Sequence, residues 1–276
     1  MAYKPQTHKK QAVPLRHDLG QNFLRDEEVC RRIAASCGAD KTCGVLEIGP
    51  GDGALTRKLA LIAGKVAAIE LDHRLLPVLE TGLAHLPNVE IVQGDALSVD
   101  LPAFISEHLQ GLTPLVCANL PYQITTPMVE NLLESRLFTT VCVMVQKEAA
   151  LRLTASPGSA QWNESSLFCS YYAEGQILFD VDRTCFEPMP HVTSSVVRFT
   201  RKPSPEGVED TLAQRLMRAA FRERRKKFSS GLVQTFGGEK DLWEKRLVSL
   251  GFPADVRGER FTAEDLVRLA LAIRSL

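Results

Sequence analysis

Several features that would place this 276-residue chain in a special class of protein are missing from its sequence. It contains no run of about 18 apolar residues, and its first 17 residues are polar and basic, so we expect no membrane span and no secretory signal. Its seven cysteines show no Cys-x-x-Cys spacing, which gives no support to a disulfide framework or a zinc site. The formal net charge is zero, which argues against a general polyanion binder. These absences predict an ordinary globular protein in the cytoplasm, with no metal and no membrane partner.

The pattern that is present from residue 45 onward alternates short β-branched runs with amphipathic stretches, as βαβ units do. This alternation predicts a mostly parallel sheet with helices on both faces, a Rossmann-like α/β fold. The predicted strands are 45–48, 65–69, 89–92, 115–118 and 141–145, and the predicted helices between them are 54–63, 73–83 and 128–133.

The pattern changes after residue 155. Two further strands are predicted at 176–179 and 195–199, and the proline-rich segment between them excludes helix. Residues 201–207 are rich in proline and glycine and form the best linker candidate. Helices are predicted beyond it at 210–228, 241–250 and 263–275, the last begun by the capping pattern Thr262-Ala263-Glu264-Asp265. We expect a flexible basic tail at 1–17, an α/β domain at 18–202 and a small all-helical domain at 208–276.

A glycine cluster, Gly49, Gly51 and Gly53, lies where the first predicted strand turns into the first helix. Glycines there let the backbone approach a ligand and point N–H groups at it, although a tight turn alone also explains them. Glu70 ends the second strand about twenty residues later, where an acid can accept both ribose hydroxyls. Asp95, after the third strand, could accept a hydrogen from an adenine amino group or simply cap a helix.

The identity of the cofactor follows from the spacing of this loop. Its Gly-x-Gly-x-Gly pattern differs from the Gly-x-Gly-x-x-Gly that makes room for the pyrophosphate of a dinucleotide. Asp52 would also place a carboxylate beside any pyrophosphate. S-adenosylmethionine avoids this conflict because it carries a sulfonium and an ammonium cation, so the sequence favours a methyl donor over a nicotinamide cofactor.

The tetrapeptide Asn119-Leu120-Pro121-Tyr122 directly follows the fourth predicted strand. It could be an ordinary turn, since asparagine and proline are common in turns. As a reacting centre, the Asn119 side-chain oxygen and the Leu120 carbonyl would each accept a hydrogen from an adenine amine and direct its lone pair at the methyl group. Tyr122 would stack on the base and Pro121 would stiffen the turn. Catalysis of this kind is mostly positioning.

Two further features of the sequence predict contacts with a nucleic acid. Phe186 could complete the slot for an extruded base opposite Tyr122, or it could be ordinary core packing between two strands. Basic residues recur at helical spacing from 215 to 227, where Glu223 is the only acid, and 224–227 looks uncompensated. A solvated helix face is the usual meaning of such charge, but we expect phosphate contacts here. The predicted RNA-binding residues are Arg215, Arg218, Arg222, Arg225, Lys226 and Lys227.

Five motifs occur in order between residues 19 and 194. They are Leu-Gly-Gln-Asn-Phe-Leu at 19–24, Glu-Ile-Gly-Pro-Gly at 47–51, Asn-Leu-Pro-Tyr at 119–122, Met-Val-Gln-Lys-Glu at 144–148 and Phe-x-Pro-x-Pro-x-Val-x-Ser at 186–194. Together they resemble the KsgA family of small-subunit ribosomal RNA adenine N6,N6-dimethyltransferases, and the resemblance covers about residues 16 to 275. The resemblance implies a class I methyltransferase fold with an S-adenosylmethionine-binding catalytic domain and a helical RNA-binding domain. It implies cofactor contacts from Asn22, Leu24, Gly49, Glu70, Asp95 and Asn119.

The same resemblance implies a substrate. The family dimethylates two adjacent adenosines in the loop of the 3′-terminal helix of 16S rRNA, in an immature 30S particle late in assembly. One stretch departs from the family: where Ser-Lys-x-Tyr-Gly-x-Leu-Ser-Val is usual, residues 159–167 read Ser-Ala-Gln-Trp-Asn-Glu-Ser-Ser-Leu. This segment is expected beside the substrate entrance, so its change bears on substrate positioning more than on cofactor binding.

Two alternatives remain open. A large-subunit rRNA adenine methyltransferase of the macrolide-resistance type would share the glycine loop and a similar tetrapeptide. Leu120 and the long helical C-terminal region favour the small-subunit enzyme by resemblance. A non-catalytic ribosome-assembly factor could keep the fold without methyl transfer, but the intact cofactor and tetrapeptide residues argue against it.

Overall fold

The computed structural model describes residues 22–223 and 226–274, and both the tail expected at 1–17 and the predicted contact Arg225 lie outside these ranges. The strands are β1 (Phe23–Leu24), β2 (Cys43–Ile48), β3 (Lys65–Glu70), β4 (Val89–Gln93), β5 (Thr113–Asn119), β6 (Thr140–Gln146), β7 (Ala173–Val181), β8 (Phe186–Glu187) and β9 (Ser194–Arg201). The helices are α1 (Glu27–Ser36), α2 (Ala54–Ile62), α3 (Leu76–Leu83), α4 (Leu101–His108), α5 (Thr125–Glu134), α6 (Lys147–Leu153), α7 (Glu164–Tyr172), α8 (Asp210–Arg222), α9 (Phe228–Phe236), α10 (Lys240–Ser249) and α11 (Ala263–Arg274).

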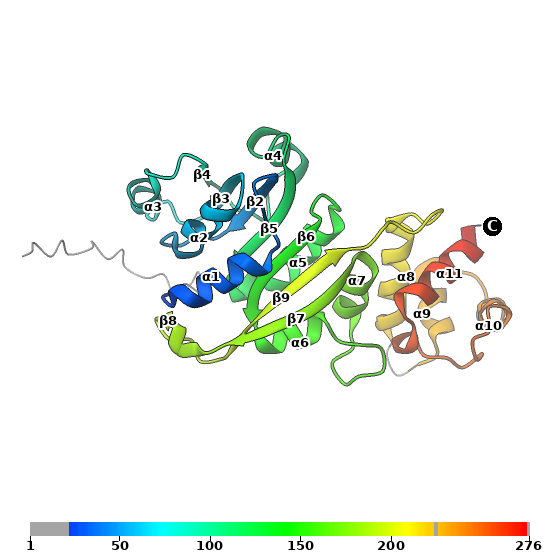
Figure 1. Cartoon of the computed structure of the whole chain (residues 1–276). Helices are drawn as coiled ribbons and strands as arrows, with labels where there is room; N and C mark the ends of the chain where they lie inside the picture. Colours follow the sequence, from blue (N-terminus) through cyan, green and yellow to red (C-terminus); the bar gives the residue numbers. More distant parts are fainter. Residues whose placement is uncertain (1–21, 224–225, 275–276) are drawn as a thin grey trace, which may run out of the picture.

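A seven-stranded sheet in the order β4-β3-β2-β5-β6-β9-β7 forms the centre of the described chain (Figure 1). The first five strands of that order are parallel, whereas β9 runs antiparallel to both β6 and β7. β1 and β8 form a separate antiparallel pair. The predicted mostly parallel sheet is therefore confirmed. β9 alone in this sheet runs against the other strands, because β7, which is antiparallel to β9, has the direction of β6.

Apolar side chains cover both faces of the sheet, because successive residues of a strand point to opposite sides. Val45 of β2 packs into a core with α1 and α2, while its neighbour Leu46 packs into the core shared with α5 and α7. All six residues of β2 are buried, as a central parallel strand requires. The helices predicted after β2, β3 and β5 are present.

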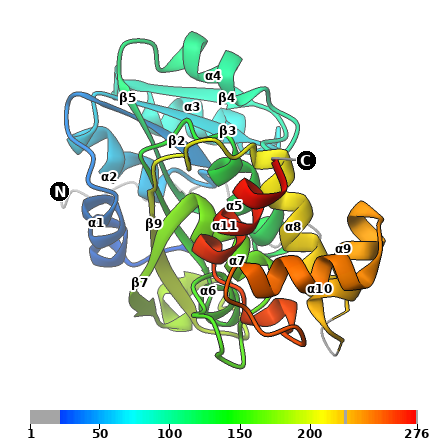
Figure 2. The same ribbon diagram turned by 90° about the vertical axis from the view of Figure 1, so that its right-hand side faces the viewer.

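The C-terminal helices α8 to α11 gather at one end of the sheet, beside α5 and α7 (Figures 1 and 2). The core on the α5 and α7 face continues into them through Leu216, Leu232 and Leu266. The segment between β9 and α8 is coil, where the linker was predicted. The division into a domain at 18–202 and a domain at 208–276 stays a prediction, since the apolar core runs across it.

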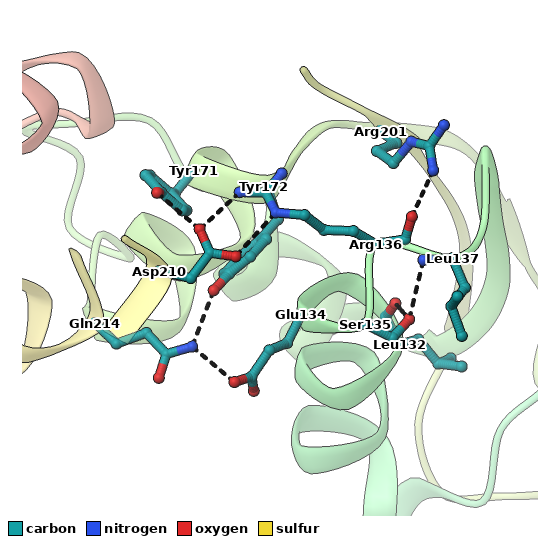
Figure 3. Close-up of polar contacts among 10 residues, drawn as sticks. All are labelled: Leu132, Glu134, Ser135, Arg136, Leu137, Tyr171, Tyr172, Arg201, Asp210 and Gln214. Atoms are coloured by element: carbon teal, nitrogen blue, oxygen red, sulfur yellow. Dashed lines mark hydrogen bonds and ion pairs between the residues drawn. The ribbon is translucent and has the colours of Figure 1, made fainter. Parts of the chain in front are cut away.

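A polar network ties α8 to α5 and α7 (Figure 3). The Arg136 guanidinium donates through Nε and Nη2 to the two oxygens of Asp210, at 2.9 and 3.0 Å. The Tyr171 hydroxyl donates to the same carboxylate at 2.9 Å. Gln214 donates to the Tyr172 hydroxyl at 2.9 Å and to a Glu134 oxygen on α5. These bonds fix the first turns of α8 against the α/β part of the molecule.

The single helix predicted at 210–228 is wrong, because α8 ends at Arg222 and a separate helix, α9, begins at Phe228. Phe228 is buried against Phe261, with ring centroids 4.6 Å apart, and its N–H donates to the Val256 carbonyl. A continuous helix would have carried Phe228 away from that core.

Several helices that the periodicity did not predict begin at capping residues. Asp26 accepts from the Val29 N–H before α1, Asp100 accepts from the Ala103 N–H before α4, and Asn163 forms a capping box before α7. The capping box predicted before α11 is confirmed, because Thr262 and Asp265 exchange hydrogen bonds at 3.0 to 3.1 Å. None of the described helices has the length and apolar content that a bilayer crossing would need.

Candidate active site

A pocket opens at the C-terminal ends of β2, β3 and β5, and its wall includes β1 and the turns after β2 and β4. The predicted residues of the cofactor site and the reacting centre line this pocket, with Phe186 as the exception. They are Asn22, Leu24, Gly49, Gly51, Glu70, Asp95, Asn119, Leu120, Pro121 and Tyr122. The fold thus brings together residues from distant segments of the chain, while their individual roles stay predictions.

The glycine loop needs glycine for conformational reasons. Gly49, Gly51 and Gly53 have φ angles of 67°, 62° and 81°, in the left-handed region that other residues rarely adopt. A Cβ atom on Gly51 would also lie 3.0 Å from the Phe23 ring of β1. The loop therefore turns tightly enough to bring its backbone to the pocket.

Glu70 organises this loop from the end of β3. It is 5% exposed, and its carboxylate accepts hydrogen bonds from the Gly51 N–H at 3.2 Å and the Asp72 N–H at 2.8 Å. Burial raises the pKa of Glu70, and these N–H donors partly offset the rise. Asp95 accepts from the Leu97 N–H at 3.0 Å, so it caps a turn and lines the pocket at the same time.

Glu47 lines the pocket, although it was not among the residues predicted for the site and belongs to the Glu-Ile-Gly-Pro-Gly motif. It is fully buried at the end of β2, and among the described residues its Oε2 atom has no hydrogen-bond partner. Burial is the main cause that raises the pKa of Glu47 to about 8; the neighbouring Thr56 hydroxyl opposes the rise and the Glu70 carboxylate adds to it. An unpaired buried acid in this wall suits a cationic ligand. The signal that could have found it is an acid just before the glycine turn.

The tetrapeptide is held at the end of β5 from two sides. The Leu120 N–H donates to the Met144 carbonyl of β6 at 3.1 Å. The Asn119 amide nitrogen donates to the Asn22 carbonyl at 3.4 Å, which leaves its side-chain oxygen as the acceptor of that carboxamide. Tyr122 begins a short 3-10 helix, and its hydroxyl shares a hydrogen bond of 2.8 Å with that of Ser194.

The segment around β1 links the cofactor loop to the segment that carries Phe186. β1 pairs with β8, and Arg25 forms ion pairs with both Asp52 of the glycine loop and Glu187 of β8. Phe186 itself is 5% exposed and packs in the core with Leu24, outside the pocket. This burial fits the core-packing alternative for Phe186, and a role of its ring in stacking on a base stays a prediction.

The altered segment 159–167 has a structural role. Trp162 is buried in the core, and Asn163 with Ser166 forms the capping box that begins α7. The segment does not line the pocket. Its departure from the family pattern therefore bears on α7 and its surroundings, not on the cofactor site.

The basic residues of the C-terminal region are partly engaged within the protein. The Arg215 guanidinium lies 4.4 Å from the Phe236 ring centroid and donates to the Thr235 carbonyl. The expectation that 226 and 227 are uncompensated is wrong, because Lys226 pairs with Glu223 at 2.8 Å and Lys227 pairs with Glu244 at 3.2 Å. Arg218 and Arg222 are exposed on α8. RNA contacts by these residues stay a prediction, best supported for that exposed pair.

Comparisons with known proteins agree with this geometry. Residues 13–261 match the family model described as ribosomal RNA adenine dimethylase. The chain is 40% identical over 273 residues to ribosomal RNA small subunit methyltransferase A of Shouchella clausii, covering 97% of this chain and 92% of that protein. It is 38% identical over 271 residues to the protein of the same name from Bacillus mycoides, covering 96% and 93%.

Solved structures show the same fold. A dimethyladenosine transferase from Plasmodium falciparum superposes with a TM-score of 0.79 at 23% identity, covering 92% of this chain and 98% of that one. The 23S rRNA methyltransferase ErmE superposes with a TM-score of 0.71 at 27% identity, covering 92% and 100%. The likeness extends over nearly the whole chain.

Proposed function

This chain belongs to the ribosomal RNA adenine dimethylase family, and we propose that it transfers methyl groups from S-adenosylmethionine to the N6 atoms of adenosines in small-subunit rRNA. The observation that carries the proposal is the single pocket in which the glycine loop, Glu70 and Asp95 meet the tetrapeptide 119–122. The relatives named small subunit methyltransferase support the choice of subunit.

The residues of the pocket fit S-adenosylmethionine. The buried Glu47 oxygen without a partner among the described residues suits a ligand that carries positive charge. Glu70 would accept from the ribose hydroxyls, and Asp95 from the adenine amino group of the cofactor. When bound, the cofactor supplies an electrophilic methyl group on its sulfonium.

The chain's own residues then position the substrate amine. The Asn119 side-chain oxygen and the Leu120 carbonyl accept its two hydrogens and turn the nitrogen lone pair toward the methyl group. Tyr122 stacks on the base, and Pro121 keeps the two acceptors in register. No strong general base is needed, because an N-methylated arylammonium loses its proton readily. Positioning of this kind can supply effective molarities of about 10⁵ to 10⁸ M.

The finer part of the proposal concerns the natural substrate. We infer that the enzyme modifies two adjacent adenosines in the loop of the 3′-terminal helix of 16S rRNA, within an immature cytoplasmic 30S particle. Exposed Arg218 and Arg222 on α8 would contact phosphates of that particle.

The test is to incubate the protein with labelled S-adenosylmethionine and immature 30S particles, 50S particles or naked rRNA, and to map the modified adenosines. We expect two adjacent dimethylated adenosines in 16S rRNA from the 30S sample. Label only in 50S particles would identify the large-subunit alternative. The 23S rRNA methyltransferase ErmE shares the fold of this chain, which is why that alternative is included in the test. No label with retained 30S binding would identify an assembly factor.

A further inference from the structure

The first residue of β9 contacts the tetrapeptide 119–122 through one hydrogen bond. Ser194 is the first residue of β9, its side chain is fully buried, and its hydroxyl lies 2.8 Å from the Tyr122 hydroxyl. Tyr122 lines the pocket, whereas Ser194 does not. Ser194 therefore contacts the wall of the site from behind.

The backbone around Ser194 is held on both sides. In the sheet, Ser194 pairs with Gln146 of β6 and with Val181 of β7. The adjacent Thr193 carbonyl accepts from the Lys147 N–H at 3.0 Å. A hydroxyl on such a residue is a fixed point for any side chain that bonds to it.

Tyr122 has more freedom than Ser194. It starts a three-residue 3-10 helix after Pro121, is only partly buried, and its side chain turns about two torsions. The hydroxyl oxygen lies on the axis about which the second torsion turns the ring, so a bond at this end restricts the first torsion and fixes the direction in which the ring points. Burial raises the pKa of the Tyr122 phenol, so the neutral hydroxyl that makes this bond persists at ordinary pH.

We propose that Ser194 is a positioning residue, which holds the Tyr122 ring in its place in the pocket wall so that a substrate adenine stacks in register with the acceptors of 119–120. The inference rests on the proposed function, because it assigns the ring that place for an adenine. Loss of the Ser194 hydroxyl should lower kcat about tenfold or more, since small misplacements of a reacting group are costly. Cofactor binding should stay unchanged.

The chain offers a matched control in the next residue. Ser195 is also fully buried in β9, but its hydroxyl donates to Asp180 at 2.6 Å, away from Tyr122. Ser195→Ala removes the same atom from the same strand without touching the ring. A general effect of deleting a buried serine hydroxyl would appear in both variants.

The experiment compares the wild type with Ser194→Ala, Ser195→Ala, Tyr122→Phe and the double variant Ser194→Ala/Tyr122→Phe. Methyl transfer to the rRNA substrate gives kcat and KM, and calorimetry gives cofactor affinity. We expect Ser194→Ala and Tyr122→Phe to lower kcat by similar factors, the double variant to lose no more than either alone, and Ser195→Ala to stay within about twofold of the wild type. Equal effects of the two serine changes, or additive losses in the double variant, would overturn the proposal.

A second readout does not depend on methyl transfer. The chain has four tyrosines, so the χ1 rotamer populations of Tyr122 are accessible to NMR of the tyrosine-labelled protein. Ser194→Ala should populate additional χ1 rotamers of Tyr122 and Ser195→Ala should not; unchanged populations in Ser194→Ala would contradict the role given to its hydroxyl. A wild-type chain that transfers no methyl group defeats the proposed function, and the rotamer populations still decide whether Ser194 holds the ring.

Discussion

At the scale of single residues, the site combines acids of different character. Glu70 is satisfied by backbone N–H donors, whereas the Glu47 oxygen Oε2 has no partner among the described residues. Glu70 therefore holds the backbone of the glycine loop. Glu47 is the acid whose protonation state a bound ligand would change.

Glu47 predicts a pH dependence of stability. Its pKa is about 8 in the folded protein against an ordinary 4.5, so between these values the folded state binds a proton that the unfolded chain has released. The bound proton stabilises the folded state fully below pH 4.5. This contribution to the free energy of unfolding is lost as pH rises to about 8, by at most about 1.4 kcal/mol per pH unit. Denaturant unfolding of the cofactor-free protein at pH 5 to 8 should show this slope, and Glu47→Gln should reduce it, leaving the contribution of Glu70, whose pKa burial also raises. The exposed Glu80→Gln serves as control; a slope as steep in Glu47→Gln as in the wild type contradicts the assignment.

Substitution of Asn119 should affect methyl transfer more than cofactor binding. Asn119→Ala should lower methyl transfer by a factor of about 100 or more, because one of the two acceptors of the amine is removed. Cofactor affinity should weaken only in part, since Glu70 and the glycine loop remain. Single-turnover transfer and calorimetry measure the two effects. Gln123→Ala, an exposed neighbour that also lines the pocket, should change neither greatly; full activity of Asn119→Ala would defeat the mechanism.

At the scale of elements, close helix packing decides where the C-terminal region turns. Gly231 of α9 lies so near α8 that a Cβ atom on it would be 2.1 Å from the Ala219 carbonyl oxygen. Phe228 of α9 is buried, and it packs against Phe261. The break after α8 lets α9 fold back along it.

Gly231→Ala should separate these helices and destabilise the protein by about 1 to 3 kcal/mol, since the clash is with backbone. Gly82→Ala is the matched control, because Gly82 is also helical, in α3, and has open space where a Cβ would lie. That control should be neutral or stabilise by about 0.5 to 1 kcal/mol through helix propensity. Urea unfolding of both variants measures the difference. Equal stabilities would rule out the close packing of α8 and α9.

At the scale of the whole molecule, positive charge is distributed unevenly in spite of zero net charge. Lys226 and Lys227 have acidic partners and Arg215 packs on Phe236, which leaves Arg218 and Arg222 as the better candidates for phosphate. The C-terminal helices and α1 lie at opposite ends of the molecule (Figure 1).

Charge reversal of Arg218 and Arg222 together should weaken binding to immature 30S particles. It should also flatten the dependence of log K on log salt, by about 0.7 to 0.9 for each phosphate that the variant no longer neutralises. Filter binding between low and physiological salt measures both. The control for the change of net charge is the double reversal Arg31→Glu/Arg32→Glu on α1, where both arginines are exposed. If the double variant binds as the wild type does, α8 does not contact the RNA.

The sequence by itself determined the features that depend on neighbours along the chain. The βαβ alternation, the positive φ positions at Gly49 to Gly53, the capping box of Thr262 and Asp265 and the location of the tetrapeptide at a strand end all follow from local patterns. Parallel strands end at one edge, so the convergence of Glu70, Asp95 and Asn119 on one pocket was also predictable in outline.

Only the tertiary structure decided contacts between segments that no local pattern relates. It placed Ser194 against Tyr122, buried Phe186 in the core, left the Glu47 oxygen unpaired among the described residues and gave Lys227 a partner in Glu244. The physical reason is that side-chain pairing across the sheet and between helices depends on register and packing over the whole core. Identical local sequences could meet different partners in another arrangement of the same elements.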